Sequence, residues 1–419
     1  MSSRTSCLCV CAAMMLAAGS TATAQSTVRF ATFNVSLNRA GPGILEANLA
    51  TTDNAQARVI AENIQRINPD VILLNEFDYD ENGNSGRLFQ DNYLSVSQNG
   101  ANPVSYPYRY FAPSNTGVFT GFDLDNNGTV GLGNDAQGFG FFEGQFGMML
   151  YSKHPIQTNN IRTFQNFLWK DMPGNRLPDD PATPQAQDWY SPEEQNILRL
   201  SSKSHWDVPI TVNGQTVHLL AAHPTPPVFD GAEDRNGTRN ADEIRLFADY
   251  ITPGASDYIY DDNGQTGGLA ADQKFVILGD YNSDPLDGDS IPGAMQQLLN
   301  NPRVNTSITP DSEGGLDAAI RQSGANDSHL SDPRFDTADF ADGAPGNLRA
   351  DYVLPSSDMT MVDAGVFWPV EGDPLFPIVG NFPFPGTDHR LVWADVIVPA
   401  PGAPALALVA VVVVGRRRR

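Results

Sequence analysis

Apolar and polar residues alternate along this chain in runs that predict strands and helices in turn. Asp70–Phe77 is nearly continuous in apolar residues, as expected for a strand buried on both faces. Asn54–Asn68 has isoleucines at helical spacing and ends before a proline, and Asn240–Ile251 is a second amphipathic helix. This interleaving predicts sheets covered by helices. The other predicted strands are Thr27–Val35, Gly147–Lys153, Gln215–His223, Lys274–Asp280, Ala350–Leu354 and Leu391–Val398, and Gly293–Leu299 is a short helix.

Long segments rich in Asp, Asn, Gly and Pro separate these elements. Loops of such length inside a compact domain are usually functional or ordered by ions. No low-complexity linker, charge block or internal repeat divides the interior, so we expect one large α/β domain over residues 25–398. The long segments are Asp78–Pro107, Gly117–Gly144, Met172–Pro192 and Pro224–Asn240.

Residues 1–24 have the pattern of a secretory signal peptide. A single charge at Arg4 precedes an apolar stretch, and an Ala-x-Ala cleavage pattern ends at Ala24. A buried N-terminal helix is the alternative interpretation. The three cysteines, Cys7, Cys9 and Cys11, all lie within this segment, so the exported protein would contain no thiol and no disulfide. We therefore expect a secreted, periplasmic or cell-surface protein.

Residues 399–419 form a second distinctive end. A Pro/Gly hinge is followed by an apolar run over Ala403–Gly415 and by four arginines. The run is short for a membrane-spanning helix, which needs about 20 residues. The tail resembles exosortase-type sorting signals, although Val-Pro-Ala-Pro stands where the usual motif has a glutamate between the prolines. This implies transient contact with the membrane or with a sorting machinery, and a simple membrane anchor is the alternative.

The chain is strongly acidic, with 26 Lys+Arg against 49 Asp+Glu and a net charge of −23. Without Arg4 and the four terminal arginines, 21 basic residues face 49 acidic ones, a net charge of about −28. Such a field repels polyanions, so a nucleic-acid substrate would need a local cation, from a metal or an arginine. The simpler interpretation is solubility in a salty or calcium-rich exterior.

Five short segments each place a polar residue at or next to the end of an apolar run. A carboxylate at the exit of a buried strand is either a ligand or a solvated loop residue. Carboxylate and amide oxygens suit magnesium, manganese or calcium, and imidazoles transfer protons near neutral pH. Together the five supply the groups that hydrolysis of a phosphate ester needs. The segments are TFNV, LLNEFD, AAHP, GDYNSD and TDHR, with Asn34, Glu76, His223, Asp280, Asn282, Asp388 and His389.

In this order the segments resemble the endonuclease/exonuclease/phosphatase superfamily, which includes deoxyribonuclease I, inositol-phosphate phosphatases and bacterial sphingomyelinases. The resemblance covers nearly all of residues 25–398. It implies a four-layer α/β sandwich, in which two facing mixed β-sheets are flanked by helices and the site lies at one edge. GDYNSD is the most specific match, because its glycine permits a tight strand exit and Asp-x-Asn in a strand points both side chains the same way. A plain Asx-turn is the alternative for this segment.

The resemblance also implies roles for individual residues. Glu76 would bind a divalent metal, Mg²⁺ or Mn²⁺ with Ca²⁺ as a third candidate, beside Asn34 and with Asp388 as a further metal residue. Asp280 would orient and deprotonate the attacking water, and Asn282 would bind the phosphate.

Two of the six histidines fall at motif positions. By resemblance, His223 and His389 would stabilise or protonate the phosphoryl transition state, and Asp351 in RADYVL would hold His389. His218 lies five residues before His223, so it faces the opposite side of a regular strand, and we interpret it as structural.

The sequence departs from deoxyribonuclease I-like enzymes at one point. Those enzymes pair the first histidine with a glutamate from a segment that best matches Pro103–Pro113. This stretch has no carboxylate, and Tyr108 and Arg109 stand there instead. The partner of His223 is therefore open, and these two residues either touch substrate or serve packing and the surface.

Two acidic loops reproduce the first half of a calcium loop, Asp-x-Asp-x-Asn-Gly. Both lack the glutamate expected at the twelfth position. Structural calcium that orders the loops and ordinary acidic turns are the two interpretations. The loops carry Asp78, Asp80 and Asn82, and Asp123, Asp125 and Asn127.

The leading hypothesis is a secreted, monomeric, metal-dependent phosphoesterase that uses in-line attack of water, with phosphodiester (nuclease-like) cleavage preferred. Its partner would be a phosphate ester, with nucleic acid among the candidates, although no basic stripe supports extended nucleic-acid binding. The alternatives are a phosphomonoesterase acting on sugar or inositol phosphates and a sphingomyelinase-like lipid phosphodiesterase. An alternative of another class is a calcium-ordered, non-catalytic surface protein on the same fold.

Overall fold

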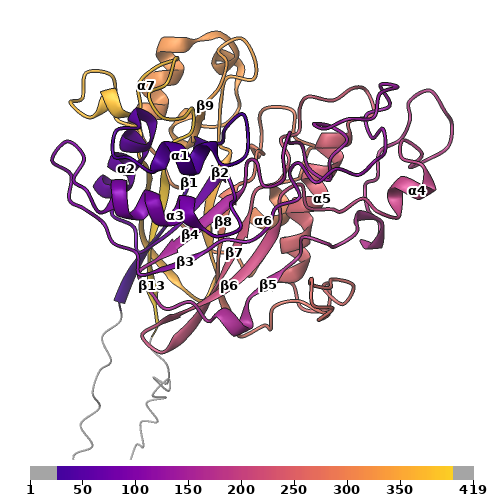
Figure 1. Ribbon diagram of the computed structural model, residues 1–419, viewed down its shortest axis with the longest axis horizontal. Coiled ribbons are helices and arrows are strands. Elements are labelled where there is room, and N and C mark those ends of the chain that lie inside the picture. The colour runs from indigo at the N-terminus through magenta and orange to yellow at the C-terminus, as the bar shows by residue number, and fades with distance from the viewer. Residues whose placement is uncertain (1–25, 400–419) are drawn as a thin grey trace, which may run out of the picture.

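The computed structural model describes residues 26–399, in which two large sheets pack against each other (Figure 1). The first sheet has six strands in the order β12-β13-β1-β2-β4-β3, and the second has five in the order β11-β8-β7-β6-β5. The first contains β1 (Ser26–Leu37), β2 (Val71–Phe77), β3 (Tyr108–Tyr110), β4 (Met148–Ser152), β12 (Thr360–Val366) and β13 (Val392–Val398). The second contains β5 (Arg162–Thr163), β6 (His205–Val212), β7 (Gln215–Ala222), β8 (Lys274–Asp280) and β11 (Asp351–Pro355), and β9 (Ala338–Asp339) pairs with β10 (Asn347–Leu348).

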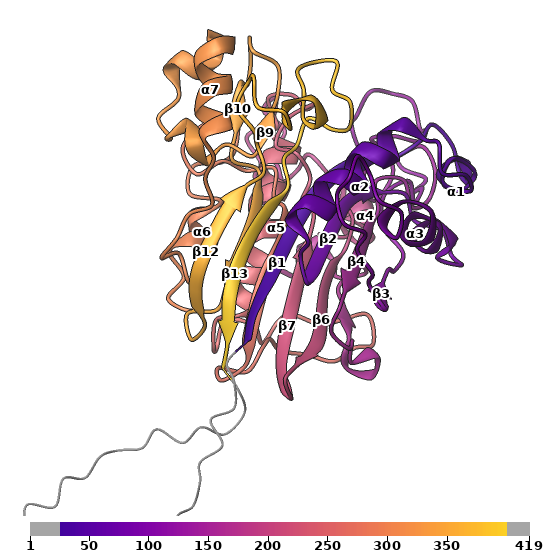
Figure 2. The ribbon, with the colours of Figure 1, turned by 90° about the vertical axis from the view of Figure 1, so that its left-hand side faces the viewer.

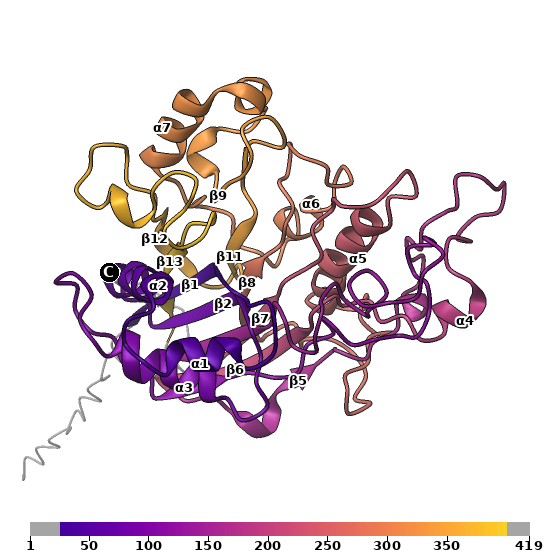
Figure 3. The ribbon, with the colours of Figure 1, turned by 45° about the horizontal axis from the view of Figure 1, so that its top comes forward.

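Both large sheets are mixed. β1 pairs in parallel with β2 and antiparallel with β13. β7 likewise pairs in parallel with β8 and antiparallel with β6. The strands β1, β2, β7 and β8 run in the same direction, so their carboxyl ends lie at one end of the sandwich. Figure 3 turns this end toward the viewer.

Helices cover the two outer faces. The helices are α1 (Ile44–Leu49), α2 (Ala55–Ile67), α3 (Asn84–Phe89), α4 (Pro192–Gln195), α5 (Arg235–Tyr250), α6 (Gln296–Leu299) and α7 (Glu313–Gln322). Local sequence sets the bounds of α2: the Asn54 side chain accepts the backbone N–H of Ala57, and Asn68 ends the helix at φ 51°. The predicted helix over 240–251 begins five residues earlier than expected, at Arg235.

Successive side chains of each strand point to opposite faces of its sheet, and this alternation separates three hydrophobic cores. In β2, Val71 and Leu73 belong to the core between the sheets, whereas Ile72 and Leu74 pack with the apolar face of α2. In β8, Val276 and Leu278 lie in the central core, and Phe275 and Ile277 pack with α5. The order is therefore helices, sheet, sheet, helices, which confirms the predicted four-layer α/β sandwich.

The two described ends of the chain lie together, as Figure 2 shows at the foot of β1 and β13. Ser26 pairs with Val398 in this ladder, at the end of the sandwich opposite to the carboxyl ends of β1 and β2. The predicted signal peptide and nearly all of the predicted C-terminal tail lie outside the described residues. Within residues 26–399, no helix has the length and apolar character needed to cross a membrane.

Candidate active site

Asn34 connects the two sheets at the carboxyl end of β1. Its Nδ2 atom donates to Oε1 of Glu76 over 3.1 Å and to Oδ2 of Asp280 over 2.9 Å. A second amide, Nδ2 of Asn38, donates to Oε2 of Glu76 over 2.8 Å. Glu76 is the next-to-last residue of the buried strand β2 and Asp280 ends β8, so a single amide holds carboxylates from both sheets.

The exit of β8 requires its glycine. Gly279 lies against β7 so closely that an added Cβ would stand 2.0 Å from the carbonyl oxygen of Ala222. Asp280 then ends the strand, and Asn282 has left it, with φ 51° and its backbone N–H donated to Oδ1 of Asp280 over 2.8 Å. An Asx-turn therefore directs the Asn282 side chain. The expectation that strand alternation points the side chains of Asp280 and Asn282 the same way was wrong, because Asn282 lies outside the strand.

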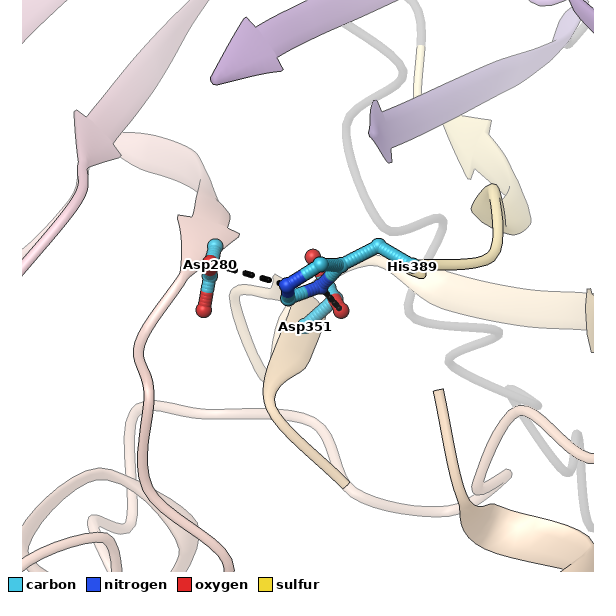
Figure 4. A group of neighbouring side chains, drawn as sticks. All are labelled: Asp280, Asp351 and His389. Carbon is cyan, nitrogen blue, oxygen red and sulfur yellow. Dashed lines mark hydrogen bonds and ion pairs between the residues drawn. The ribbon is translucent and has the colours of Figure 1, made fainter. Parts of the chain in front are cut away.

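His389 lies between two buried carboxylates (Figure 4). Its Nδ1 is 2.8 Å from Oδ2 of Asp351, and its Nε2 is 3.7 Å from Oδ2 of Asp280. Asp351 and Asp280 are paired residues of β11 and β8, and the Thr337 hydroxyl donates to Oδ2 of Asp351 over 2.8 Å. The pairing expected from the sequence between Asp351 and His389 is thus present.

His223 approaches the same carboxylate from the end of β7. Its Nε2 lies 3.5 Å from Oδ2 of Asp280. Its buried Nδ1 has no hydrogen-bond partner in the part of the chain that the structure describes. Tyr108 and Arg109 lie on β3 at the edge of the first sheet and do not replace the missing glutamate.

The two histidines have opposite protonation tendencies. Burial lowers the pKa of His223 well below its ordinary value, and the positive charges of Lys203 and His389 add to this. Burial also opposes the charge on His389, but the carboxylates of Asp351 and Asp280 outweigh it and raise that pKa well above the usual range. The surroundings therefore favour the neutral form of His223 and the cationic form of His389, an arrangement typical of acid–base sites.

The acidic groups have the chemistry of a divalent-cation site. Burial raises the pKa of Glu76, with a further contribution from Asp280, and burial likewise raises the pKa of Asp280. A bound cation would offset the free-energy cost of burying these negative charges, and oxygen donors are the ligands that Mg²⁺ and Mn²⁺ prefer. Ligand atoms of Asp280, Asp351 and His389 all lie within 4.8 Å of one another, but a cationic imidazole has no lone pair to offer a metal, so the carboxylates are the candidate ligands.

Lys203 is a site residue that the sequence did not single out. It is buried just before β6, and its Nζ is 3.5 Å from the carbonyl oxygen of Pro224. Burial lowers its pKa, while the nearby carboxylates of Glu243, Glu76 and Asp280 raise it. A lone lysine outside any motif gives no sequence signal, and only the fold brings it to the acidic cluster.

Asp388 stands directly before His389, and its negative charge is one of those that raise the pKa of that imidazole. Its half-buried carboxylate accepts a hydrogen bond from the Thr387 hydroxyl over 3.3 Å, and Asp388 is not in the close group of Asp280, Asp351 and His389. Its role as a metal residue stays a prediction.

The two calcium-like loops differ from each other. Asp78 and Asp80 accept backbone N–H groups, those that Asp80 accepts being at the start of α3, and Asn82 follows them in sequence, just before α3. In the second loop, carboxylate oxygens of Asp123, Asp125 and Asp135 lie within 4.8 Å of one another. Asp135 thus stands near the place where the sequence motif lacks its glutamate. Asp123 accepts the N–H groups of Asn127 and Gly128, so ordinary turn contacts account for that carboxylate, and a calcium ion there stays a prediction.

A cavity of about 490 Å³ opens directly onto the site. Glu76, Lys203, His223 and Asn282 line one side of it. The rest of the wall mixes apolar and polar residues and comes from the segments between β3 and β4, between β5 and β6, and between β7 and the first turns of α5. Leu124, Phe139, Phe146, Tyr190, Leu198 and Phe229 are among its residues. A larger hollow of about 740 Å³ beside residues 176–187 contains none of the predicted site residues.

The sequence matches the Endonuclease/Exonuclease/phosphatase family over residues 31–389, so the chain belongs to this family. Members of the family are usually metal-dependent phosphoesterases. No curated protein matches the chain.

Solved structures of the same fold are distant in sequence. An endonuclease/exonuclease/phosphatase from Beutenbergia cavernae is 16% identical, with 89% of this chain and 72% of that chain covered and a TM-score of 0.48. A beta toxin mutant from Staphylococcus aureus, solved with bound magnesium ions, is 16% identical, with 88% and 99% covered and a TM-score of 0.44. Sphingomyelinase C from Streptomyces griseocarneus is 16% identical, with 88% and 99% covered and a TM-score of 0.41.

Proposed function

We propose that this protein is a secreted phosphoesterase that requires Mg²⁺ or Mn²⁺ and preferentially cleaves phosphodiesters. One observation carries the proposal: Asn34 joins Glu76 and Asp280, and both histidines converge on the same oxygen of Asp280. A non-catalytic surface protein has no need of buried carboxylates and an uncompensated imidazole nitrogen at one point.

Glu76, with Asp280 close by, would hold the metal. The bound cation would polarise the phosphate and neutralise charge that develops on its oxygens. Asn38 and Asn34 fix the two oxygens of Glu76 by donating to them, so this ligand is oriented before the cation arrives.

The protein residues around the phosphate would divide the remaining work. Asp280, oriented by Asn34 and by the backbone N–H of Asn282, would position the attacking water and accept its proton. His389, kept cationic by Asp351, would donate to a phosphoryl oxygen or to the leaving oxygen. Neutral His223 and the amide of Asn282 would add hydrogen bonds to the phosphate.

Lys203 supports the proposal on electrostatic grounds. The whole chain carries a net charge of −23, which repels phosphate. A buried ammonium in the wall of the cavity supplies local positive charge where the substrate would lie. Because this cation is enclosed, salt screens it less than it screens the acidic surface.

A phosphomonoesterase that acts on sugar or inositol phosphates is the second candidate. The enclosed cavity beside Lys203 favours it, because a small phosphate fits such a space more easily than an extended polymer. A sphingomyelinase-like activity on lipids is a third possibility within the same chemistry.

Export and membrane sorting also stay proposals. The proposals of export and sorting rest on the sequence of residues 1–24 and 399–419. We also propose that the protein is a monomer. Fractionation of the native host, with detection in the medium and envelope, tests export; recovery from the cytoplasm alone would contradict it.

The activity is tested with a panel of phosphate esters. Plasmid DNA, RNA, bis-p-nitrophenyl phosphate, p-nitrophenyl phosphate, inositol phosphates and sphingomyelin are each incubated with Mg²⁺, Mn²⁺ or Ca²⁺ and with chelator. We expect turnover of diesters that chelator abolishes. Hydrolysis of monoesters alone would select the second candidate, and no turnover by a folded, metal-loaded protein would overturn the proposal for these substrates.

A further inference from the structure

The cavity that opens onto the site includes several residues with an unusual backbone conformation. Glu76, Phe146, Phe229 and Asn282 all line this cavity, and all have left-handed φ angles, between 51° and 67°, although none is a glycine. Bulky residues rarely adopt this conformation. Such strain persists only where surrounding contacts enforce it, and it is typical of ligand clamps and active sites.

Phe229 is the most informative of the four. Its φ is 67°, and its side chain is 82% exposed, so packing does not explain why a phenylalanine stands there. The start of α5 holds the segment in place: Nη2 of Arg235 donates to the Phe229 carbonyl over 3.3 Å, and Nδ2 of Asn236 donates to the Val228 carbonyl over 2.7 Å. The backbone N–H of Asn236 also donates to Asp230 over 2.7 Å. The fold therefore fixes an exposed aromatic ring at the rim of the cavity.

Two further phenylalanines stand in the same wall. The rings of Phe139 and Phe146 are 6.3 Å apart, and Phe139 is 49% exposed. Aromatic rings at such distances present faces and edges on which another ring can stack. The wall thus offers several aromatic surfaces within a cavity of about 490 Å³.

Polar groups in the wall distinguish between an aromatic ring and a fatty acyl chain as the occupant. Asn134, Asn236 and Arg235 line the cavity together with the phenylalanines. Their donors are paired within the protein, Asn134 with Asp125 and the other two with the backbone before α5, yet the wall they form is polar, and a fatty acyl chain gains less from a polar wall than from an apolar one. A heteroaromatic ring can stack on phenylalanine and also exchange hydrogen bonds with such groups.

We propose that this cavity binds the heteroaromatic ring of a nucleotide-sized phosphate ester, with Phe229 stacked on the ring and the phosphate beside Lys203 and Glu76. The inference rests on the proposed function, because it names the substrate class of that same site. A cavity of about 490 Å³ falls within the range of about 300–1,000 Å³ that small-molecule sites occupy. It accommodates one nucleotide unit, and a long polyanion gains nothing from it.

The test measures binding, so that it does not depend on turnover. Adenosine 5′-monophosphate and ribose 5-phosphate are titrated calorimetrically in Mg²⁺ into full-length protein carrying His389→Ala, which prevents consumption of ligand. We expect the adenine-bearing ligand to bind at least about tenfold more tightly. Adding Phe229→Ala should remove that difference and leave the affinity for ribose 5-phosphate within twofold.

A matched variant controls for the loss of an exposed ring. Phe382 is 86% exposed and does not line the cavity, so Phe382→Ala should preserve the preference for adenosine 5′-monophosphate. Thermal unfolding of each variant verifies the fold, which an exposed ring should not affect.

Three results would overturn the inference. These are equal affinity for the two ligands, equal weakening of both by Phe229→Ala, or binding of sphingomyelin vesicles that depends on Phe229 without any preference for the adenine ring. If the ring preference is present but the wild-type protein hydrolyses no phosphate ester, the ring site stands and the proposed phosphoesterase function fails.

Discussion

The Nδ1 atom of His389 lies 2.8 Å from Oδ2 of Asp351, in a contact that joins the start of β11 to the loop before β13. The carboxylate therefore holds the imidazole with its other nitrogen directed toward Asp280. This geometry favours the cationic imidazole and fixes its orientation, both of which would serve the proposed hydrolysis of a phosphate ester.

Removal of this contact should lower activity and preserve the fold. We expect His389→Ala to reduce kcat by about 10²–10⁴-fold, and Asp351→Asn to reduce it by about 10²-fold because the imidazole loses its charged partner. Steady-state hydrolysis of the best substrate of the panel measures both effects.

A second His–Asp pair provides the matched control. Nδ1 of His218 lies 2.7 Å from Oδ1 of Asp207, away from the cavity. His218→Ala should therefore leave kcat within about twofold. If it lowered kcat as much as His389→Ala does, the role assigned to His389 would be wrong.

Lys203→Met should affect turnover more than substrate binding. The ammonium would stabilise charge that grows on the phosphate as the transition state forms, so we expect kcat to fall by about 10²-fold with a smaller rise in KM. Lys203→Arg should restore part of the activity, because it restores the charge. Lys274→Met removes an ion pair with Asp358 at the far end of β8 and should leave both constants unchanged. A rise in KM alone would show that Lys203 serves ground-state binding.

Asp336 predicts a loss of stability as the pH rises from 3.8 to about 8, independent of catalysis. Burial, together with the carboxylates of Asp284, Asp287 and Asp332, raises its pKa to about 8 in the folded protein, above its ordinary value of 3.8. The folded state therefore binds the proton more tightly than the unfolded state. That contribution to the free energy of unfolding is complete below the unfolded pKa and is lost as the pH rises through about 8.

Unfolding of wild type and Asp336→Asn from pH 6 to pH 9 tests this prediction. The wild type should lose stability across this range more steeply than Asp336→Asn, which has no proton to lose at that position. Asp257→Asn, at an exposed carboxylate, is the control and should follow the wild-type curve. If the free energy of unfolding changed with pH in the same way for wild type and Asp336→Asn, the effect assigned to the Asp336 proton would be wrong.

Much of the fold could be predicted from the sequence because its apolar runs are long and regular. The predicted strand over 274–280 has the observed bounds of β8, and that over 70–77 differs from β2 by one residue. β6 was missed because Pro209 interrupts it, and proline in a run argues against a strand. β12 was missed because a register shift between Met361 and Asp363 breaks its alternation.

Helix α7 was missed for a related reason. Gly314 and Gly315 occupy its first turn, and glycine weakens a helical pattern. An added Cβ at Gly314 would stand 1.8 Å from the carbonyl oxygen of Trp368, so this glycine serves a close approach that no local pattern reveals.

The site could be predicted only where residues stand in motifs. Asn34, Glu76, His223 and Asp280 converge because the carboxyl ends of β1, β2, β7 and β8 meet at one edge. Asp351 and His389 join them from the start of antiparallel β11 and from the loop before β13. Lys203 and Phe229 carry no motif, and their positions follow from tertiary packing alone. The roles proposed for them rest on the burial of Lys203 and on the left-handed backbone of Phe229.

The most direct test of the central claim is a titration of hydrolysis with Mg²⁺ in chelator-stripped protein, compared between wild type and Glu76→Gln. We predict that wild type has no activity without the cation and regains it saturably, and that Glu76→Gln, folded to the same extent, needs at least about tenfold more Mg²⁺ for half-activity. Equal hydrolysis with and without chelator, or the same Mg²⁺ dependence in both proteins, would contradict a metal-dependent phosphoesterase built on Glu76.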